Sequence, residues 1–378
     1  MTEINGTCPD RFAAVKDAFA ANFTDAPEGL DELAARFSVC MGGETVIDLW
    51  AGHADAAKTT PFTDRSLVPV FSTGKVVMSL MIAALVERGL VTYDTPVAEV
   101  LPAFGQAGKN RITLGQLMSH QAGLPGFAET VDPAIWFDRE AVLDRLAAQA
   151  PMWEPGSASG YHPITIGYLA GEVFRLLDGR TMGTALREDF AAPFDLDLWV
   201  GLPEDQHDRV AQLRKPSAAP DLGTIDAVKK AAFLDRGSAP GGRGSTEWRK
   251  MEIPSANMHA RADSLARIMG VLANGGMLDG KTILSPETLA EATRERIHGP
   301  DRVLPFTIRW AAGWMRNESL DIFGPDPETL GHCGWGGSCA MADPTTNVSA
   351  AYVMTRQSPH LIGDPRALRL FESLYAAI

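Results

Sequence analysis

Three short segments of the chain contain residues whose types and spacing suit nucleophilic catalysis. The first is Phe71-Ser72-Thr73-Gly74-Lys75, in which the serine precedes the lysine by three residues. On a helix, positions i and i+3 lie on one face, so the hydroxyl and the amine would meet there. A buried lysine can take the serine proton because desolvation lowers its pKa. Alone, the spacing is weak evidence, since a serine that caps a helix beside an unrelated lysine gives the same pattern.

The second segment is a Trp-Glu-Pro-Gly sequence at 153–156, followed by Tyr161-His162-Pro163. A tyrosine that faces a lysine can act as a general base, either as a phenolate or by sharing a proton. A core tyrosine is the alternative interpretation of Tyr161, and this segment by itself would favour it.

The third segment is the glycine-rich run 331–338, with the sequence Gly-His-Cys-Gly-Trp-Gly-Gly-Ser. Glycines let a backbone approach a ligand closely, and a main-chain N–H in this run would supply half of an oxyanion hole. A tight turn into an edge strand is the alternative.

The elements that must position these residues follow from hydrophobic spacing. The segment from Ser72 to Arg88 is apolar on nearly every face and ends at Gly89, which predicts an internal helix with Ser72 at its start. Alternation on either side of Gly42-Gly43 predicts a hairpin. Further predicted elements are an amphipathic first helix at 12–23, a helix at 164–177, a surface loop within 216–248, a helix at 260–273, strands at 311–316, 338–342 and 348–354, and a final helix through 370–378.

Strands at both ends of the chain around a helical middle predict an α+β fold. With 378 residues the chain is long for a single core. We expect residues 1–89 and 255–378 to form one discontinuous α/β domain and residues 90–254 to form a mainly helical inserted domain. A cleft between the two is the expected site.

Composition narrows the class of protein. The chain has 47 acidic and 34 basic residues and a net charge of −13, which argues against nucleic acid or an anionic membrane surface as a partner. The longest apolar run, 76–86, is too short to span a bilayer, and no secretory signal is visible. The four cysteines form no CxxC pair, which favours free thiols and a cytoplasmic location. No metal-binding H-E-x-x-H, no G-x-S-x-G elbow and no cofactor motif occurs, so neither a metal nor a cofactor is expected.

In this order, the three segments resemble the serine β-lactamase and penicillin-binding-protein superfamily, which carries S-x-x-K and K-T-G signatures. The phrase from Leu114 to Pro125 is similar to the LLSHTSGLP segment of the class C β-lactamase branch, and 256–267 is similar to that branch's lead into a core helix. The resemblance covers almost the whole chain. It implies an antiparallel sheet flanked by helices, with an inserted mainly helical domain.

The resemblance also implies roles for individual residues. Ser72 matches the nucleophile, Lys75 the motif lysine and Tyr161 the first residue of Y-x-N, whereas His332-Cys333-Gly334 falls where K-T-G would stand. The backbone N–H groups of Ser72 and Trp335 would form the oxyanion hole. The residues expected to contact substrate are His332, Gly334, Trp335, Phe127 and Trp136, the three aromatic ones also being plausible core residues.

Two departures from the family pattern bear on function. Pro163 replaces the asparagine of Y-x-N, and His332, mostly neutral at pH 7, replaces the lysine of K-T-G. Groups that would bind a β-lactam or a peptide carboxylate are therefore missing. These departures point to the family VIII carboxylesterases, which hydrolyse small esters and in some members open β-lactams slowly. The alternatives are a β-lactamase or D,D-peptidase, a transacylase, and a catalytically silent binding module.

Overall fold

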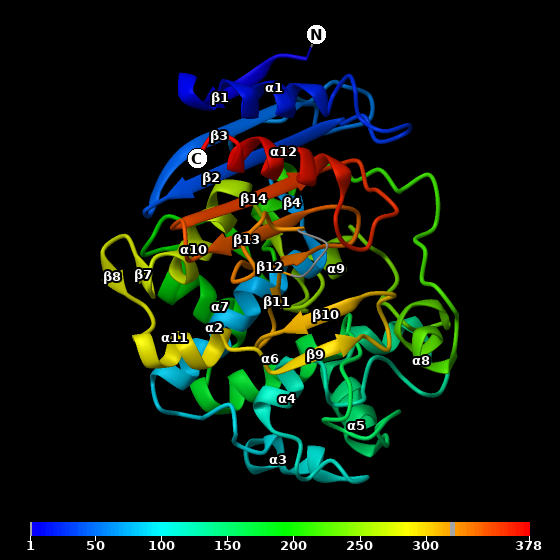
Figure 1. Ribbon diagram of the computed structural model, residues 1–378. Helices are drawn as coiled ribbons and strands as arrows, with labels where there is room; N and C mark the ends of the chain where they lie inside the picture. Colours follow the sequence, from blue (N-terminus) through cyan, green and yellow to red (C-terminus); the bar gives the residue numbers. More distant parts are fainter. Residues whose placement is uncertain (1, 318–321) are drawn as a thin grey trace.

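A large antiparallel sheet forms one half of the protein. The computed structural model describes residues 2–317 and 322–378. Nine strands pair in the order β1-β3-β2-β14-β13-β12-β11-β10-β9, every pair antiparallel (Figure 1). The strands are β1 Ile4–Thr7, β2 Ala34–Met41, β3 Glu44–Gly52, β9 Ile297–Pro300, β10 Thr307–Trp310, β11 Met315–Arg316, β12 Leu330–Cys333, β13 Cys339–Asp343 and β14 Val348–Met354. Strands from both ends of the sequence thus meet at the β2–β14 pair.

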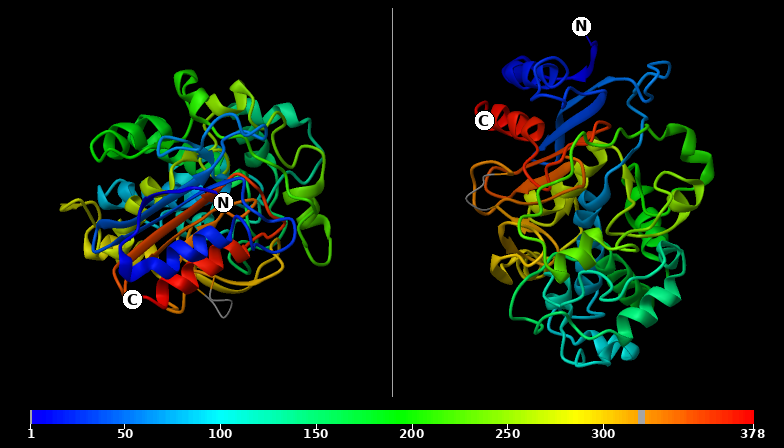
Figure 2. Two further views of the ribbon diagram at one scale, coloured as in Figure 1. Left: turned by 90° about the horizontal axis from the view of Figure 1, so that it is seen from above. Right: turned by 90° about the vertical axis from the view of Figure 1, so that its right-hand side faces the viewer.

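Both faces of the sheet are covered, which explains why its central strands are apolar at nearly every position. Helices α1 (Ala13–Ala21) and α12 (Pro365–Tyr375) pack side by side on one face, and α10 (Ala262–Ala273) packs on the other (Figures 1 and 2). Alternate residues of β2 accordingly belong to two separate hydrophobic clusters, Phe37 facing α12 and Ala34 facing the α10 side.

Helix α2 (Lys75–Glu87) crosses the interior, as its all-round apolarity predicted. It contacts α6 (Thr165–Asp178), α10 and α11 (Pro286–Thr293). Ser72 lies in one 3₁₀ turn, η2 (Phe71–Gly74), directly ahead of α2. The predicted position of the serine at the start of the central helix is therefore confirmed.

The middle of the sequence is mainly helical and lies at the end of the molecule opposite the two termini (Figure 1). Its elements are α3 Val97–Val100, η3 Pro102–Gly105, α4 Leu114–Met118, η4 Pro133–Phe137, α5 Arg139–Ala148, α6, α7 Met182–Leu186, η5 Arg187–Ala191, η6 Glu204–Arg209, α8 Ala227–Lys229, η7 Lys230–Leu234 and α9 Thr246–Lys250. Short strands complete the fold: β4 Val68–Pro69 and β5 Leu198–Trp199 flank β6 His259–Ala260, and β7 Met277–Leu278 pairs with β8 Lys281–Thr282.

Two predicted elements differ from the structure. The prediction of one strand over 311–316 is wrong, because Gly313, with φ +95°, turns the chain between β10 and β11. The stretch 216–248, predicted to include a long surface loop, has a mostly exposed loop at 216–226, but it also contains α8, η7 and the start of α9. The domain boundaries at 89–90 and 254–255 stay a prediction, and one hydrophobic cluster contains residues from both sides of them.

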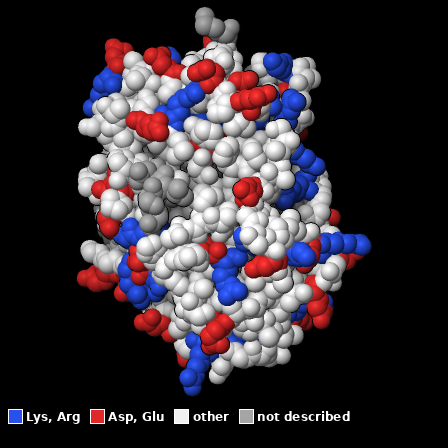
Figure 3. Space-filling view, turned by 45° about the vertical axis from the view of Figure 1, so that its right-hand side comes forward, with Lys and Arg blue, Asp and Glu red and all other residues white. Residues whose placement is uncertain are grey.

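The surface matches the charge balance of the sequence. Acidic and basic side chains are interspersed on the face shown in Figure 3. Within residues 2–317 and 322–378, no helix is both long and apolar enough to cross a membrane.

Candidate active site

The serine of the first segment sits at a local distortion of the backbone. Phe71, the residue before it, has φ +48°, a left-handed conformation that costs a non-glycine residue about 1–3 kcal/mol. The hydrogen bond from Val70 N–H to the Met258 carbonyl fixes the chain just ahead of this turn. Ser72 then lines a cavity of about 170 Å³. The strained residue thus directly precedes the one that presents the hydroxyl.

Lys75 is held entirely by neutral oxygens. Its Nζ lies 3.1 Å from Ser72 Oγ, 2.8 Å from the Pro163 carbonyl oxygen and 2.8 Å from the Ser255 carbonyl oxygen. The side chain is fully buried, and no described carboxylate forms an ion pair with it. Desolvation therefore lowers the pKa of Lys75 well below its ordinary value of 10.5. A neutral amine fits this site: its two N–H groups donate to the carbonyls, and its lone pair faces the serine.

Tyr161 contacts the same hydroxyl from a different segment, the loop just before α6. Its Oη lies 2.6 Å from Ser72 Oγ, and its ring lies under the Lys75 amine, with Nζ 4.7 Å from the ring centroid. Burial raises the pKa of Tyr161 above its ordinary value of 10, despite the opposing effect of the Ser72 hydrogen bond. The phenol is therefore protonated at neutral pH. Of the two bases suggested by the sequence, the neutral Lys75 amine is the one that burial favours.

Neighbouring side chains orient Tyr161. Its backbone N–H donates to Asp301 Oδ1 at 2.9 Å, and its ring stacks on Trp310 with centroids 6.0 Å apart and planes 4° apart. His120 packs edge-on against the same ring at 5.0 Å. Sequence reasoning assigned no role to these three neighbours. His120 stands in the quoted phrase 114–125, the one signal available there, whereas Asp301 and Trp310 are brought to the site by the β9–β10 hairpin alone.

The glycine-rich third segment lies against the Ser72 turn. A Cβ placed on Gly334 would lie 2.3 Å from the Val70 carbonyl oxygen and 2.6 Å from Thr73 Oγ1, so only glycine fits. Ser338 Oγ donates to the same Val70 carbonyl at 3.0 Å. Among the described residues, the N–H groups of Ser72 and Trp335 have no hydrogen-bond acceptor. Two free main-chain donors on touching segments suit an oxyanion hole.

The wall of the cavity differs from the expected set of substrate contacts. Trp335 lines the cavity beside Ser72, together with Phe71, Pro163, Ile164, Ala232, Phe233, Ser238, Ala239, Pro240, Arg243, Trp248 and Ala256. Phe127 and Trp136 do not: their rings pack together at 4.9 Å in the core, and Trp136 Nε1 donates to the Gly237 carbonyl. Because both side chains are aromatic, they were predicted to line the pocket, but in the structure they pack in the core.

His332 and Gly334 are also absent from this wall. The His332 side chain is 1% exposed, and its ring centroid lies 5.7 Å from that of Tyr161. Burial lowers its pKa to about 3, so the ring is neutral. That His332 and Gly334 contact substrate therefore stays a prediction: in the structure Gly334 allows close packing of the backbone, and the His332 ring packs against Tyr161.

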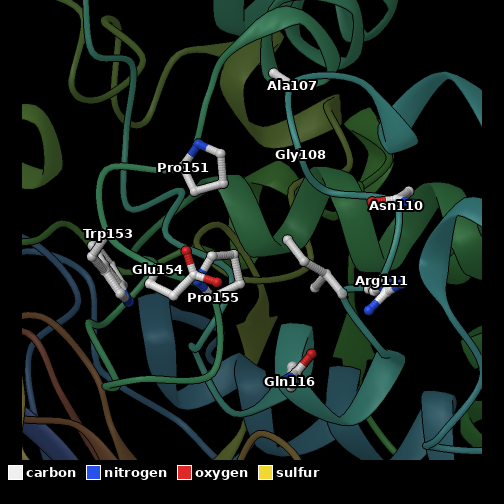
Figure 4. Close-up of a pocket in the computed structure, with 10 residues that line it drawn as sticks. Ala107, Gly108, Asn110, Arg111, Gln116, Pro151, Trp153, Glu154 and Pro155 are labelled. Atoms are coloured by element: carbon white, nitrogen blue, oxygen red, sulfur yellow. The ribbon is translucent and has the colours of Figure 1, made fainter.

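A second cavity of about 410 Å³ lies away from Ser72. Figure 4 shows its wall, where Trp153, Glu154 and Pro155 face Arg111 and Gln116. It contains none of the three expected catalytic side chains. In the described part of the chain no group of three or more His, Cys, Asp or Glu side chains is arranged to hold a metal ion.

Comparisons with known proteins agree with this geometry. The family model described as beta-lactamase matches residues 19–374. The esterase/β-lactamase LipL of Mycobacterium tuberculosis is 36% identical over 373 residues, which cover 95% of this chain and 85% of LipL.

Two solved structures superpose over the full length of both chains. A penicillin-binding-protein homologue from Caulobacter crescentus has a TM-score of 0.97 and 55% identity. A family VIII carboxylesterase has a TM-score of 0.92 and 36% identity. The predicted α+β architecture, an antiparallel sheet flanked by helices, is confirmed.

Proposed function

The chain belongs to the β-lactamase family, and from this premise we propose that it is a serine carboxylesterase that cleaves small carboxylic esters through an acyl-enzyme on Ser72. The observation that carries the proposal is the convergence on Ser72 Oγ of Lys75 Nζ at 3.1 Å and Tyr161 Oη at 2.6 Å. Both groups are buried and oriented, as general acid–base catalysis requires.

In the first half-reaction, Ser72 Oγ attacks the ester carbonyl carbon as its proton passes to the neutral Lys75 amine. The carbonyl oxygen becomes an oxyanion, which the N–H groups of Ser72 and Trp335 bind. As the bond from the carbonyl carbon to the alcohol oxygen breaks, Tyr161 donates its proton to that oxygen and takes one from the Lys75 ammonium. The alcohol leaves, and Ser72 carries the acyl group as an ester.

In the second half-reaction, water takes the place of the alcohol. The Lys75–Tyr161 pair accepts a proton from the water as its oxygen attacks the acyl carbon. The same two N–H groups bind the second oxyanion. When the bond to Ser72 Oγ breaks, the proton returns to the serine and the carboxylic acid is released.

The cavity beside Ser72 suits the acyl part of a small ester. Its volume is about 170 Å³, and apolar side chains such as Phe233 and Trp248 dominate it. At the position of the K-T-G lysine, His332 is neutral and covered by Tyr161, so it offers no fixed cation. LipL, described as an esterase/β-lactamase, and the family VIII carboxylesterase are both 36% identical to this chain, and both descriptions include ester hydrolysis.

The direct test compares 4-nitrophenyl butyrate with nitrocefin as substrates of the purified protein. We expect a kcat/KM for the butyrate far above that for nitrocefin, and loss of both activities in Ser72→Ala. A nitrocefin turnover far above the ester rate would replace this proposal with a β-lactamase.

The β-lactamase or D,D-peptidase function is the second candidate. One observation favours it: the structure with 55% identity is described as a penicillin-binding-protein homologue. The same acyl-enzyme chemistry would then act on an amide. The nitrocefin comparison separates the two.

We further propose that the enzyme works in the cytoplasm on a small-molecule substrate. All four cysteines are free thiols, and three of them, Cys40, Cys333 and Cys339, are buried. Free thiols are usual where the environment is reducing.

A further inference from the structure

A larger cavity adjoins the one at Ser72. Its volume is about 770 Å³, and the two cavities share Phe71, Arg243, Trp248 and Trp335 in their walls. The segment 210–219 closes it on the other side. A substrate whose carbonyl lies at Ser72 can therefore extend past Trp335 into this space.

The charged residues of this larger cavity all have the same sign. Lys215, Arg243 and Arg249 line it, and no Asp or Glu is among its described lining residues. Because the chain contains 47 acidic and only 34 basic residues, a wall with three cations and no carboxylate runs against the overall balance. Such a wall raises the local concentration of anions.

These cations are not neutralised by the protein. Among the described residues, no carboxylate forms an ion pair with Lys215, Arg243 or Arg249. Arg249 Nη1 donates only to the His207 carbonyl, at 3.3 Å, and its Nε is buried with no acceptor. Because a guanidinium N–H without an acceptor is costly, Arg249 keeps an unsatisfied donor in the wall of this cavity.

Arg243 is the cation nearest to the reaction centre. Its guanidinium carbon lies 5.6 Å from the centroid of the Phe71 ring and 5.9 Å from that of Trp335, the residues that flank the nucleophile and the oxyanion site. Two aromatic faces orient a guanidinium while leaving its N–H edge free for a carboxylate.

We propose that the preferred esters of this enzyme carry a carboxylate, which binds Arg243 in the larger cavity while Lys215 and Arg249 reinforce the positive potential there. The inference rests on the proposed esterase function and specifies its substrate class. In this proposal Arg243, which lies in the segment ahead of α9, takes the place of the missing K-T-G lysine. Esters that carry a quaternary ammonium group are excluded by the same potential.

The test uses three chromogenic esters, because the carboxylate can stand on either side of the ester bond. 4-Nitrophenyl butyrate is neutral, mono-4-nitrophenyl glutarate carries the charge on the acyl side, and 5-butyryloxy-2-nitrobenzoate carries it on the leaving group. For at least one of the two anionic esters, we expect Arg243→Gln to lower kcat/KM by about 10- to 100-fold, the effect of losing a charged hydrogen bond. The neutral butyrate, which has no carboxylate contact to lose, should be slowed much less than that anionic ester.

Two further variants sharpen the comparison. Arg243→Lys should restore part of the rate with the anionic ester, and Lys16→Gln, which removes an exposed charge on α1, should change neither rate. Added salt should slow the anionic ester and leave the neutral one unchanged.

The outcomes separate this inference from the function on which it rests. If Arg243→Gln slows neutral and anionic esters equally, or if neither anionic ester is hydrolysed while the butyrate is, the carboxylate assignment is wrong and the esterase stands. If the wild-type protein hydrolyses none of the three esters, the proposed function itself fails, and the inference fails with it.

Discussion

Lys75 is buried in a site that stabilises its neutral form. Two carbonyl oxygens take two amine hydrogens, and no described carboxylate offsets a positive charge. Tyr161 stays protonated because burial raises its pKa. In the proposed mechanism, desolvation therefore favours the Lys75 amine as the acceptor of the Ser72 proton and the Tyr161 phenol as the donor to the leaving group.

This assignment predicts the pH dependence of the reaction. The unfolded chain titrates Lys75 near 10.5, and the folded protein titrates it well below that value. We expect kcat/KM for 4-nitrophenyl butyrate to rise with pH as Lys75 loses its proton and to level off well below pH 10.5. Between the two pKa values the unfolded chain binds more protons, so this residue makes folding less favourable as the pH falls through that window. A rate that still climbs through pH 10.5 would contradict a neutral Lys75.

The role of the Tyr161 phenol as a proton donor can be tested by removing its hydroxyl group. Tyr161→Phe should keep the stacking on Trp310 and the backbone bond to Asp301, but it removes the proton donor. We expect kcat to fall by about 10²–10⁴ with the fold intact by circular dichroism. The matched control is Tyr93→Phe, since the Tyr93 hydroxyl is buried without a partner, and its rate should not change. Equal rates in the two variants would remove Tyr161 from the mechanism.

At the scale of elements, the site depends on how closely β12 and the turn after it approach η2. Gly334 allows the contact, and the Ser338 hydroxyl bridges to the Val70 carbonyl. In the proposed mechanism, this contact between two segments far apart in sequence brings the Trp335 segment to the Ser72 turn, where their N–H groups would form the oxyanion hole.

Gly334→Ala tests that contact. Its Cβ would lie 2.3 Å from the Val70 carbonyl oxygen, so the two segments must separate. We expect a fall in kcat of about 10²–10³, the usual effect of losing one oxyanion donor. Gly171→Ala is the control, because its Cβ would meet only Pro254 at 3.7 Å. Steady-state kinetics should give this variant the wild-type rate. If Gly334→Ala kept the wild-type kcat, the close packing at Gly334 would not be needed for catalysis.

Sequence patterns predicted the elements better than the pocket. The apolar helix with Ser72 at its start follows from local spacing, as do the Ser72–Lys75 pair and the hairpin at 37–50. Phe127 and Trp136 were misplaced because an aromatic residue has the same appearance in a core and in a pocket wall. Asp301 and Trp310 were missed because only tertiary contacts bring them to Tyr161.

At the scale of the whole molecule, a buried ionic network joins the two ends of the chain. Arg366, in the first turn of α12, pairs with Glu32 at 2.7 Å and with Asp364 at 2.7 Å, and it donates to the Leu30 carbonyl. Glu32 also accepts a hydrogen bond from the Tyr352 hydroxyl. The network fixes α12 and the start of β2 against the sheet that carries β12.

Arg366→Gln should destabilise the protein by about 3–5 kcal/mol, because it leaves the Glu32 carboxylate buried without its cation. The free energy of unfolding in urea measures this loss. Arg369→Gln, on the same helix, removes a partly exposed arginine that lies 3.8 Å from the exposed Asp25 carboxylate, and it should cost less than about 1 kcal/mol. Equal losses in the two variants would show that the network contributes little.

The central claim is that Ser72 becomes acylated because a neutral Lys75 activates it. The most direct measurement is peptide mapping by mass spectrometry after reaction with a fluorophosphonate, in the wild-type protein and in Lys75→Met. We predict a single phosphonylated residue, Ser72, in the wild type and greatly slowed labelling in the variant. Labelling at another residue, or unchanged labelling of Ser72 without Lys75, would contradict it.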